Sequence, residues 1–266
     1  MRFALSTAES GDQTSQPLEP KDRLIFALDV EDEDAAERWI RILAPHVGVF
    51  KVGPRLFAGA GPSIIERIHD AGAKTFLDLK LHDIPETVGI TSREVARMGV
   101  EMFTLHALGG SKMIRRVSEE VQAFTEAERA ERGVSARGRP LPIILAVTVL
   151  TSHSPSDLVE LGIDAPVEQQ VLRLARLAVD HGASGVVASG HEVARLKAEL
   201  PVGTVFVVPG IRSPGDDIGD QARVMTPSEA IHAGATHIVV GRPLRSAADP
   251  VAAAQRIVED VAGATE

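Results

Sequence analysis

Apolar residues give way to closely spaced charges in the stretch Thr75-Phe76-Leu77-Asp78-Leu79-Lys80-Leu81-His82-Asp83. Its first residues are typical of a β-strand, in which side chains two positions apart point to the same face. We therefore expect Asp78 and Lys80 side by side at the carboxyl end of a strand, with Asp83 just beyond in a loop. Two unit charges about 4 Å apart interact by roughly 4 kcal/mol at an effective dielectric near 20. A structural ion pair with a helix-capping aspartate would explain this pattern, and so would a catalytic cluster.

Short apolar runs of this kind alternate with amphipathic stretches along the chain. The runs predicted as strands are residues 24–28, 49–52, 75–79, 102–105, 143–149, 185–188, 205–208 and 237–240. Amphipathic stretches such as 32–43 and 167–181 lie between them. Eight strand–helix units predict an α/β protein with a single (β/α)8 TIM barrel over residues 21–266. A doubly wound sheet is the alternative, although the chain has neither a GxGxxG motif after its first strand nor a Walker A sequence.

Composition excludes several classes of protein. The chain has 266 residues, of which 44% are hydrophobic, and it has no cysteine, which excludes disulfides and thiolate chemistry. A formal net charge of −9, no tyrosine and one tryptophan argue against nucleic-acid and anionic-membrane surfaces. No apolar run is long enough to span a membrane. Residues 1–20 are polar and unlike a signal or transit peptide, so we predict a flexible N-terminal extension on a cytoplasmic protein.

Polar side chains stand where the predicted strands end. In a TIM barrel the active site is built at these carboxyl ends, by the loops that lead into the helices. The residues at these positions are Asp29, Lys51, Asp78, Lys80, His106, Thr148, Thr151, Ser189, Arg212 and Arg242. A ring of polar strand ends around one barrel mouth is hard to explain by packing, and it predicts a functional site there.

Two of these strand ends have the residues of a phosphate site. Gly210 and Arg212 follow the seventh predicted strand, and Gly241 and Arg242 follow the eighth. Barrels often bind phosphate in these two loops, because glycine allows close backbone approach and arginine offers a planar fork to phosphate oxygens. Turn glycines and solvated arginines are the alternative. The Gly-, Asp- and Pro-rich segment 213–221 resembles a mobile lid, from which Gln221 could reach the ligand.

No metal site is expected. The nine histidines show neither HxH nor HExxH spacing, and Lys80 lies between Asp78 and Asp83, where its ammonium disfavours a divalent cation. His82 and His106 are the best-placed histidines, either as structural residues or as catalytic bases. With a metal site set aside, the candidate groups for catalysis are a phosphate anchor, two lysines and several carboxylates. A lysine near a reacting carbon can supply a proton or stabilise a carbanion.

The chain strongly resembles the orotidine 5′-phosphate decarboxylase family from about residue 24 to residue 257. The motifs that carry this resemblance are Phe26-Ala27-Leu28-Asp29, Phe50-Lys51-Val52-Gly53, Asp78-Leu79-Lys80-Leu81-His82-Asp83-Ile84-Pro85, Val147-Thr148-Val149-Leu150-Thr151-Ser152, Pro209-Gly210-Ile211-Arg212 and Val239-Val240-Gly241-Arg242-Pro243. The DxKxxD element alone is shared with related phosphosugar barrels. The order and spacing of the full set are those of the short, monofunctional bacterial form.

The resemblance implies a carboxy-lyase that converts orotidine 5′-phosphate to UMP and carbon dioxide in pyrimidine biosynthesis, with no cofactor and no metal. Lys80 would protonate C6 of the pyrimidine, within a charge network of Lys51, Asp78, Lys80 and Asp83. The family is homodimeric, and its second aspartate comes from the neighbouring subunit. The remaining implied roles are ribose contacts by Asp29 and Lys51, a pyrimidine contact by Thr151, an action of Asp83 and Thr87 across the dimer interface, and phosphate contacts by Arg212, Gln221, Gly241 and Arg242.

Two other functions stay open at this point. One is a related metal-dependent barrel that acts on a sugar phosphate, as a keto-gulonate-phosphate decarboxylase or an epimerase. The former resembles this chain in its DxKxxD element but binds magnesium and typically has an acidic residue where this chain has Lys51. The other is a non-catalytic barrel that binds nucleotides. Catalysis that is indifferent to chelators would argue against the first function, and turnover of any substrate would argue against the second.

Overall fold

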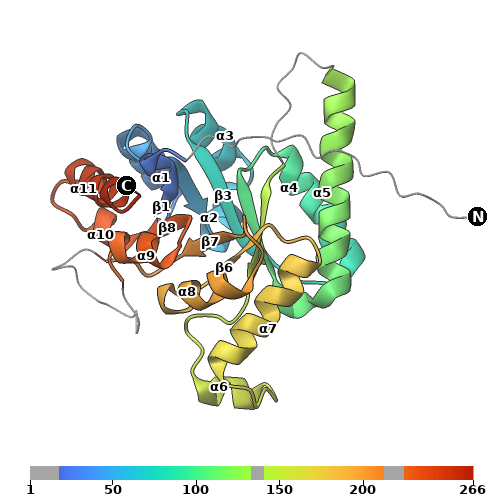
Figure 1. The fold of residues 1–266 in the computed structure, drawn as a ribbon. Helices are drawn as coiled ribbons and strands as arrows, with labels where there is room; N and C mark the ends of the chain where they lie inside the picture. The colour runs from blue at the N-terminus through green and yellow to red at the C-terminus, as the bar shows by residue number, and fades with distance from the viewer. Residues whose placement is uncertain (1–17, 133–140, 213–224, 266) are drawn as a thin grey trace, which may run out of the picture.

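The computed structural model describes residues 18–132, 141–212 and 225–265, and in these ranges it forms a closed barrel of parallel strands in the order β1 to β8 (Figure 1). The strands are β1 Leu24–Ala27, β2 Val49–Val52, β3 Lys74–Leu81, β4 Met102–His106, β5 Ile143–Val147, β6 Gly185–Val187, β7 Val205–Val208 and β8 His237–Val240. Strand β8 pairs with β1 and closes the barrel. The predicted (β/α)8 barrel is thereby confirmed.

Helices lie around the outside of the barrel and connect the strands (Figure 1). The longer ones are α1 Glu33–Leu43, α3 Ser63–Asp70, α4 Pro85–Arg97, α5 Gly110–Arg132, α7 Val167–Asp180, α8 Gly190–Glu199 and α11 Pro250–Gly263. Shorter helical segments are η1 Pro20–Arg23, α2 Pro54–Ala60, η2 Ala107–Gly109, α6 Pro155–Glu160, α9 Pro227–Ala233 and α10 Arg242–Arg245. The ends follow from the sequence: Asp32 accepts a hydrogen bond from the Ala35 N–H at the start of α1, and Gly234 ends α9 at φ 112°.

The apolar core has two parts. The larger cluster contains residues from strands and helices, so it lies between the barrel wall and the surrounding helices. The smaller cluster contains strand residues alone and fills the barrel interior; its buried members are Ile25, Ala27, Val49, Phe76, Met102, Leu145, Val207 and Val239. Because side chains alternate along a strand, the next inward position after Val49 is Lys51, and the next after Phe76 is Asp78. The interior therefore changes from apolar to charged toward the carboxyl ends of the strands.

Some predictions from the sequence fall outside the described residues. The proposed N-terminal extension over 1–20 falls mostly on residues 1–17, and the first described helical segment, η1, begins at Pro20. The lid segment 213–221, with Gln221, also lies outside the described ranges. Within those ranges, no helix is both long and apolar enough to cross a bilayer.

Candidate active site

Three charged side chains meet at the carboxyl end of β2 and β3. The Lys80 ammonium lies 2.9 Å from both carboxylate oxygens of Asp78, and the Lys51 ammonium lies 3.7 Å from Asp78 Oδ2. Asp78 is the most enclosed of these residues, with 13% of its side chain exposed, whereas Lys80 is 37% exposed. A partly buried carboxylate needs such partners, because an unpaired charge in this position loses its hydration without compensation. The structure thus brings together the central three residues of the predicted charge network.

Asp29 completes this group from the end of β1. Its Oδ1 lies 3.2 Å from the Lys51 ammonium, and about half of its side chain is exposed. The backbone carbonyl of Asp29 accepts a hydrogen bond from Arg245 Nη1 at 2.7 Å, which connects the first strand end to α10. Lys51 therefore bridges Asp29 and Asp78, and two ammonium groups face two carboxylates at the barrel mouth. Nothing in the sequence indicated a role for Arg245, whose partner is 216 positions away.

Thr104 is a second residue that the sequence analysis did not single out. It is completely buried on β4, and its Oγ1 donates a hydrogen bond to Asp78 Oδ1 at 2.9 Å. The same oxygen accepts a hydrogen bond from the backbone N–H of Lys80, also at 2.9 Å. Its position was a usable signal, because Thr104 is a polar residue between the apolar residues Phe103 and Leu105 inside β4.

Asp83 and Thr87 lie apart from this cluster. Both are exposed, and the Asp83 carboxylate accepts a hydrogen bond from the Ile84 N–H at 2.6 Å, just before α4 begins. Within the described chain, no ion pair connects Asp83 to Lys80. The fourth charge of the predicted network is therefore placed on the surface of this chain, next to the first turn of α4.

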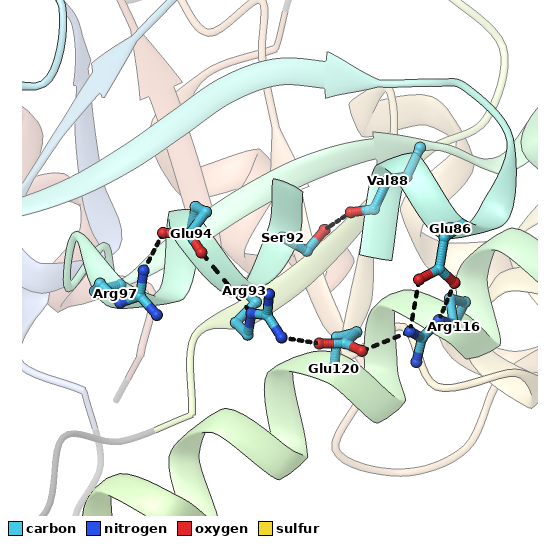
Figure 2. A network of polar contacts seen from close by, with 8 residues as sticks. All are labelled: Glu86, Val88, Ser92, Arg93, Glu94, Arg97, Arg116 and Glu120. Atoms are coloured by element: carbon cyan, nitrogen blue, oxygen red, sulfur yellow. Dashed lines mark hydrogen bonds and ion pairs between the residues drawn. The ribbon is translucent and has the colours of Figure 1, made fainter. Parts of the chain in front are cut away.

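An ion-pair network holds α4 against α5 directly beyond this point (Figure 2). Arg116 on α5 contacts both carboxylate oxygens of Glu86, at 3.0 and 3.2 Å, and lies 2.7 Å from Glu120. Glu120 also pairs with Arg93 of α4 at 3.4 Å. The hydrogen bond and charge of Arg116 lower the pKa of Glu86. Glu86 lies between Asp83 and Thr87 in sequence, so this network contacts the segment that carries both.

The residues of the predicted phosphate site lie at the ends of β7 and β8. Gly210 has φ 81°, a conformation that favours glycine, and Arg212 is buried, with its Nη1 donating to the Ile211 carbonyl at 2.8 Å. Gly241 is the N-cap of α10, and an added Cβ there would lie 3.2 Å from the Ala27 side chain. Arg242 is exposed at the first position of α10. The two Gly–Arg pairs are thus on neighbouring strands, as predicted.

Two histidines and Thr148 lie at the same end of the barrel. The His82 and His106 rings stack with their centroids 5.5 Å apart. Burial, followed by the charges of His82, Lys80 and His153, lowers the pKa of His106. Thr148 Oγ1 and His106 Nδ1 are buried without a hydrogen-bond partner among the described residues.

Thr151 is exposed in the turn that follows β5. Over the described ranges, no group of three or more His, Asp and Glu side chains is arranged to hold a metal ion.

Fold and site together define the class of this protein: it is a (β/α)8-barrel enzyme with its site at the carboxyl ends of the strands. A family model described as "Orotidine 5'-phosphate decarboxylase / HUMPS family" matches residues 22–257. The chain therefore belongs to the orotidine 5′-phosphate decarboxylase / HUMPS family, as its motifs indicated.

Individual relatives agree with this assignment. A protein of Syntrophotalea carbinolica named orotidine 5′-phosphate decarboxylase is 47% identical over 94% of this chain and 98% of its own length. One of Moorella thermoacetica with the same name is 45% identical over 91% and 92%. Among solved structures, the orotidine 5′-phosphate decarboxylase of Lactobacillus acidophilus is 37% identical, with a TM-score of 0.77 over 90% of this chain and 99% of that one.

Proposed function

We propose that this chain decarboxylates orotidine 5′-phosphate to UMP and carbon dioxide in pyrimidine biosynthesis, without a cofactor. The observation that carries the proposal is the group formed by Asp29, Lys51, Asp78 and Lys80 at the barrel mouth. The names of the relatives support the choice of substrate.

Lys80 is the proposed proton donor. The bond between C6 of the pyrimidine and its carboxylate breaks, carbon dioxide leaves, and the electron pair stays on C6. A proton then passes from the Lys80 ammonium to C6 and gives UMP, after which Lys80 regains a proton from water. Lys80 suits this role because Asp78 holds its ammonium at 2.9 Å, while its side chain is 37% exposed at the mouth of the barrel.

Lys51 and Asp78 supply the electrostatic part of the proposal. The C6 carbanion has little delocalisation into the ring, so catalysis needs charges that stabilise it more than they stabilise the bound carboxylate. The ammonium groups of Lys51 and Lys80 are fixed on the same carboxylate before any substrate arrives. Little reorganisation is then needed when charge moves to C6.

The remaining residues are proposed to bind the substrate. Asp29 and Lys51 would contact the ribose and Thr151 the pyrimidine. Phosphate would be held by Arg212, Gly241 and Arg242, with Gln221 from the segment that lies outside the described residues. Contacts to the phosphate, which does not react, can favour closure of the site over the reacting group.

We further propose a homodimer in which Asp83 and Thr87 complete the partner's site. The exposure of both residues and the separation of Asp83 from the Lys80 of its own chain support this arrangement. The proposed organisation is one barrel domain over 21–266 with an N-terminal extension over 1–20, in a cytoplasmic protein.

The magnesium-dependent branch of the family is less compatible with this site. The Lys51 ammonium lies 3.7 Å from Asp78, so a positive charge already stands where a divalent cation would need a carboxylate. The direct test follows the absorbance of orotidine 5′-phosphate after addition of enzyme that has been treated with EDTA. We expect rapid conversion to UMP. Conversion that requires added magnesium, or none from folded protein, would contradict the proposal.

A further inference from the structure

The pairing of β3 with β4 is irregular at the charged cluster. Leu77 pairs with Phe103, and the next paired residues are Leu81 and Leu105. Three residues of β3 therefore stand opposite Thr104 alone. This bulge allows both Asp78 and Lys80 to be reached from one position of β4.

Lys80 has an unusual backbone conformation inside this bulge. Its φ is 52°, and among the described residues it is the only one other than glycine with a positive φ. A long side chain rarely adopts this left-handed conformation, and it persists only where the surrounding structure holds it. The contacts of the Lys80 backbone therefore matter for where its ammonium lies.

Thr104 provides the contact. Because a backbone N–H can only donate, the Lys80 N–H uses Thr104 Oγ1 as its acceptor, at 2.9 Å. The hydroxyl proton is then free to be donated to Asp78 Oδ1, also at 2.9 Å. Thr104 is completely buried, so water cannot easily replace either bond. One hydroxyl thus connects the backbone of Lys80 to the carboxylate that holds the Lys80 ammonium.

We propose that Thr104 is a positioning residue for the reaction: its hydroxyl fixes the backbone of Lys80 and the carboxylate of Asp78 in the geometry that proton transfer needs. This role rests on the proposed function, in which Lys80 protonates C6. Without the hydroxyl, the Lys80 N–H has no acceptor on β4 and Asp78 has one donor fewer. The Lys80 ammonium then loses its fixed position relative to C6, whereas residues that bind the phosphate are unaffected.

The test replaces Thr104 by Val, which removes the hydroxyl at nearly constant shape. It also replaces Thr104 by Ser, which keeps the hydroxyl, and by Cys, whose thiol forms weaker hydrogen bonds. We expect Thr104→Val to lower kcat about 10- to 100-fold, since small misplacements of a reacting group cost this much. Its KM and its Kd for UMP should stay within about threefold of wild type, because binding contacts remain. Thr104→Ser should keep kcat near the wild-type value, and the kcat of Thr104→Cys should lie between those of the Ser and Val variants.

Thr75→Val is the matched control. Thr75 is also completely buried in the barrel wall, but its hydroxyl bonds to His69 at 3.3 Å, outside the site. We expect this variant to keep the wild-type kcat. The positioning role would be overturned if Thr104→Val kept the wild-type kcat. It would also be overturned if the fall in kcat were matched by equal rises in KM and in the Kd for UMP. If Thr104→Val does not fold, equal kcat for the Ser and Cys variants would overturn it. No turnover by the wild-type chain would instead remove the proposed function itself.

Discussion

Asp78 accepts contacts from three side chains on three strands: Lys80 at 2.9 Å, Thr104 at 2.9 Å and Lys51 at 3.7 Å. A carboxylate with so many partners is fixed in position, and it fixes both lysines in turn. The left-handed backbone of Lys80 costs on the order of 1–3 kcal/mol, a strain that such contacts must offset. Strain of this size at a reacting residue is consistent with a site built for function more than for stability.

At the residue scale, Arg242→Ala tests the phosphate contact. Charged hydrogen bonds contribute about 1.5–3 kcal/mol, so we expect KM for orotidine 5′-phosphate and Kd for UMP to rise about 10- to 100-fold. Binding of uridine, which lacks the phosphate, should not change. Arg256→Ala on α11 is the control, since this arginine is also exposed but lies outside the proposed site. Unchanged affinity for UMP in Arg242→Ala would remove the phosphate assignment.

The charged cluster could be predicted from the sequence because each of its residues is marked by its own local stretch of the chain. Lys51, Asp78 and Asp29 stand at strand ends, and alternation along a strand decides which side chains point inward. The strained φ of Lys80 and the role of Thr104 depend on how β3 pairs with β4, and this register is not encoded in either strand alone. The same limit explains why Arg245, which bonds to the distant Asp29, was missed.

At the scale of elements, the contact between α4 and α5 places the segment around Asp83. Figure 2 shows Arg116 between Glu86 and Glu120, with Arg93 on the far side of Glu120. Gly89 makes room for this arrangement, because an added Cβ there would lie 2.8 Å from Arg116 Cγ. The two helices are therefore joined by charges from the first turn of α4, at Glu86, to Arg93 in its second half.

Glu86→Gln should weaken this junction slightly. Exposed ion pairs contribute little, so we expect the Tm to fall by about 1–3 °C, and the difference should shrink in 1 M salt. Glu66→Gln on α3, which removes an exposed glutamate outside the network, should leave Tm unchanged. A Tm for Glu86→Gln equal to that of wild type at low salt would show that the network does not hold α4.

Element boundaries were predictable where the sequence has local signals. Helix α9, Pro227–Ala233, begins after its N-cap Thr226 and ends at Gly234, and both residues are local signals in the sequence. Strand β3 runs to Leu81, beyond the predicted end at residue 79, because its bulge keeps it paired past the charged residues. The short helix α6, Pro155–Glu160, was not predicted, because so few residues show little periodicity.

At the scale of the whole molecule, the barrel has a charged mouth at one end and a buried histidine at the other. His237 begins β8 and is 4% exposed. Burial, followed by the charges of Arg23 and Lys74, lowers its pKa to about 4. It is therefore neutral in the folded protein near pH 7, whereas in the unfolded chain it takes up a proton near pH 6.5.

This difference predicts a loss of stability in acid. The unfolded state binds the proton first as pH falls, so stability from His237 is complete above about pH 6.5 and is lost progressively down to about pH 4. The loss amounts to about 3 kcal/mol. Measured by urea unfolding, His237→Gln should lack this loss, so its free energy of unfolding approaches that of wild type as pH falls. Gln255→Ala, at an exposed residue of α11 that does not titrate, should run parallel to wild type. Parallel curves for His237→Gln would refute the assignment.

Lys80→Ala removes the proposed proton donor of the cofactor-free decarboxylation. We expect kcat to fall about 10³-fold or more, while the variant stays folded and still binds UMP. Lys197→Ala, which removes an exposed lysine on α8, should keep wild-type turnover. Turnover by Lys80→Ala within about tenfold of wild type would show that Lys80 is not the proton donor.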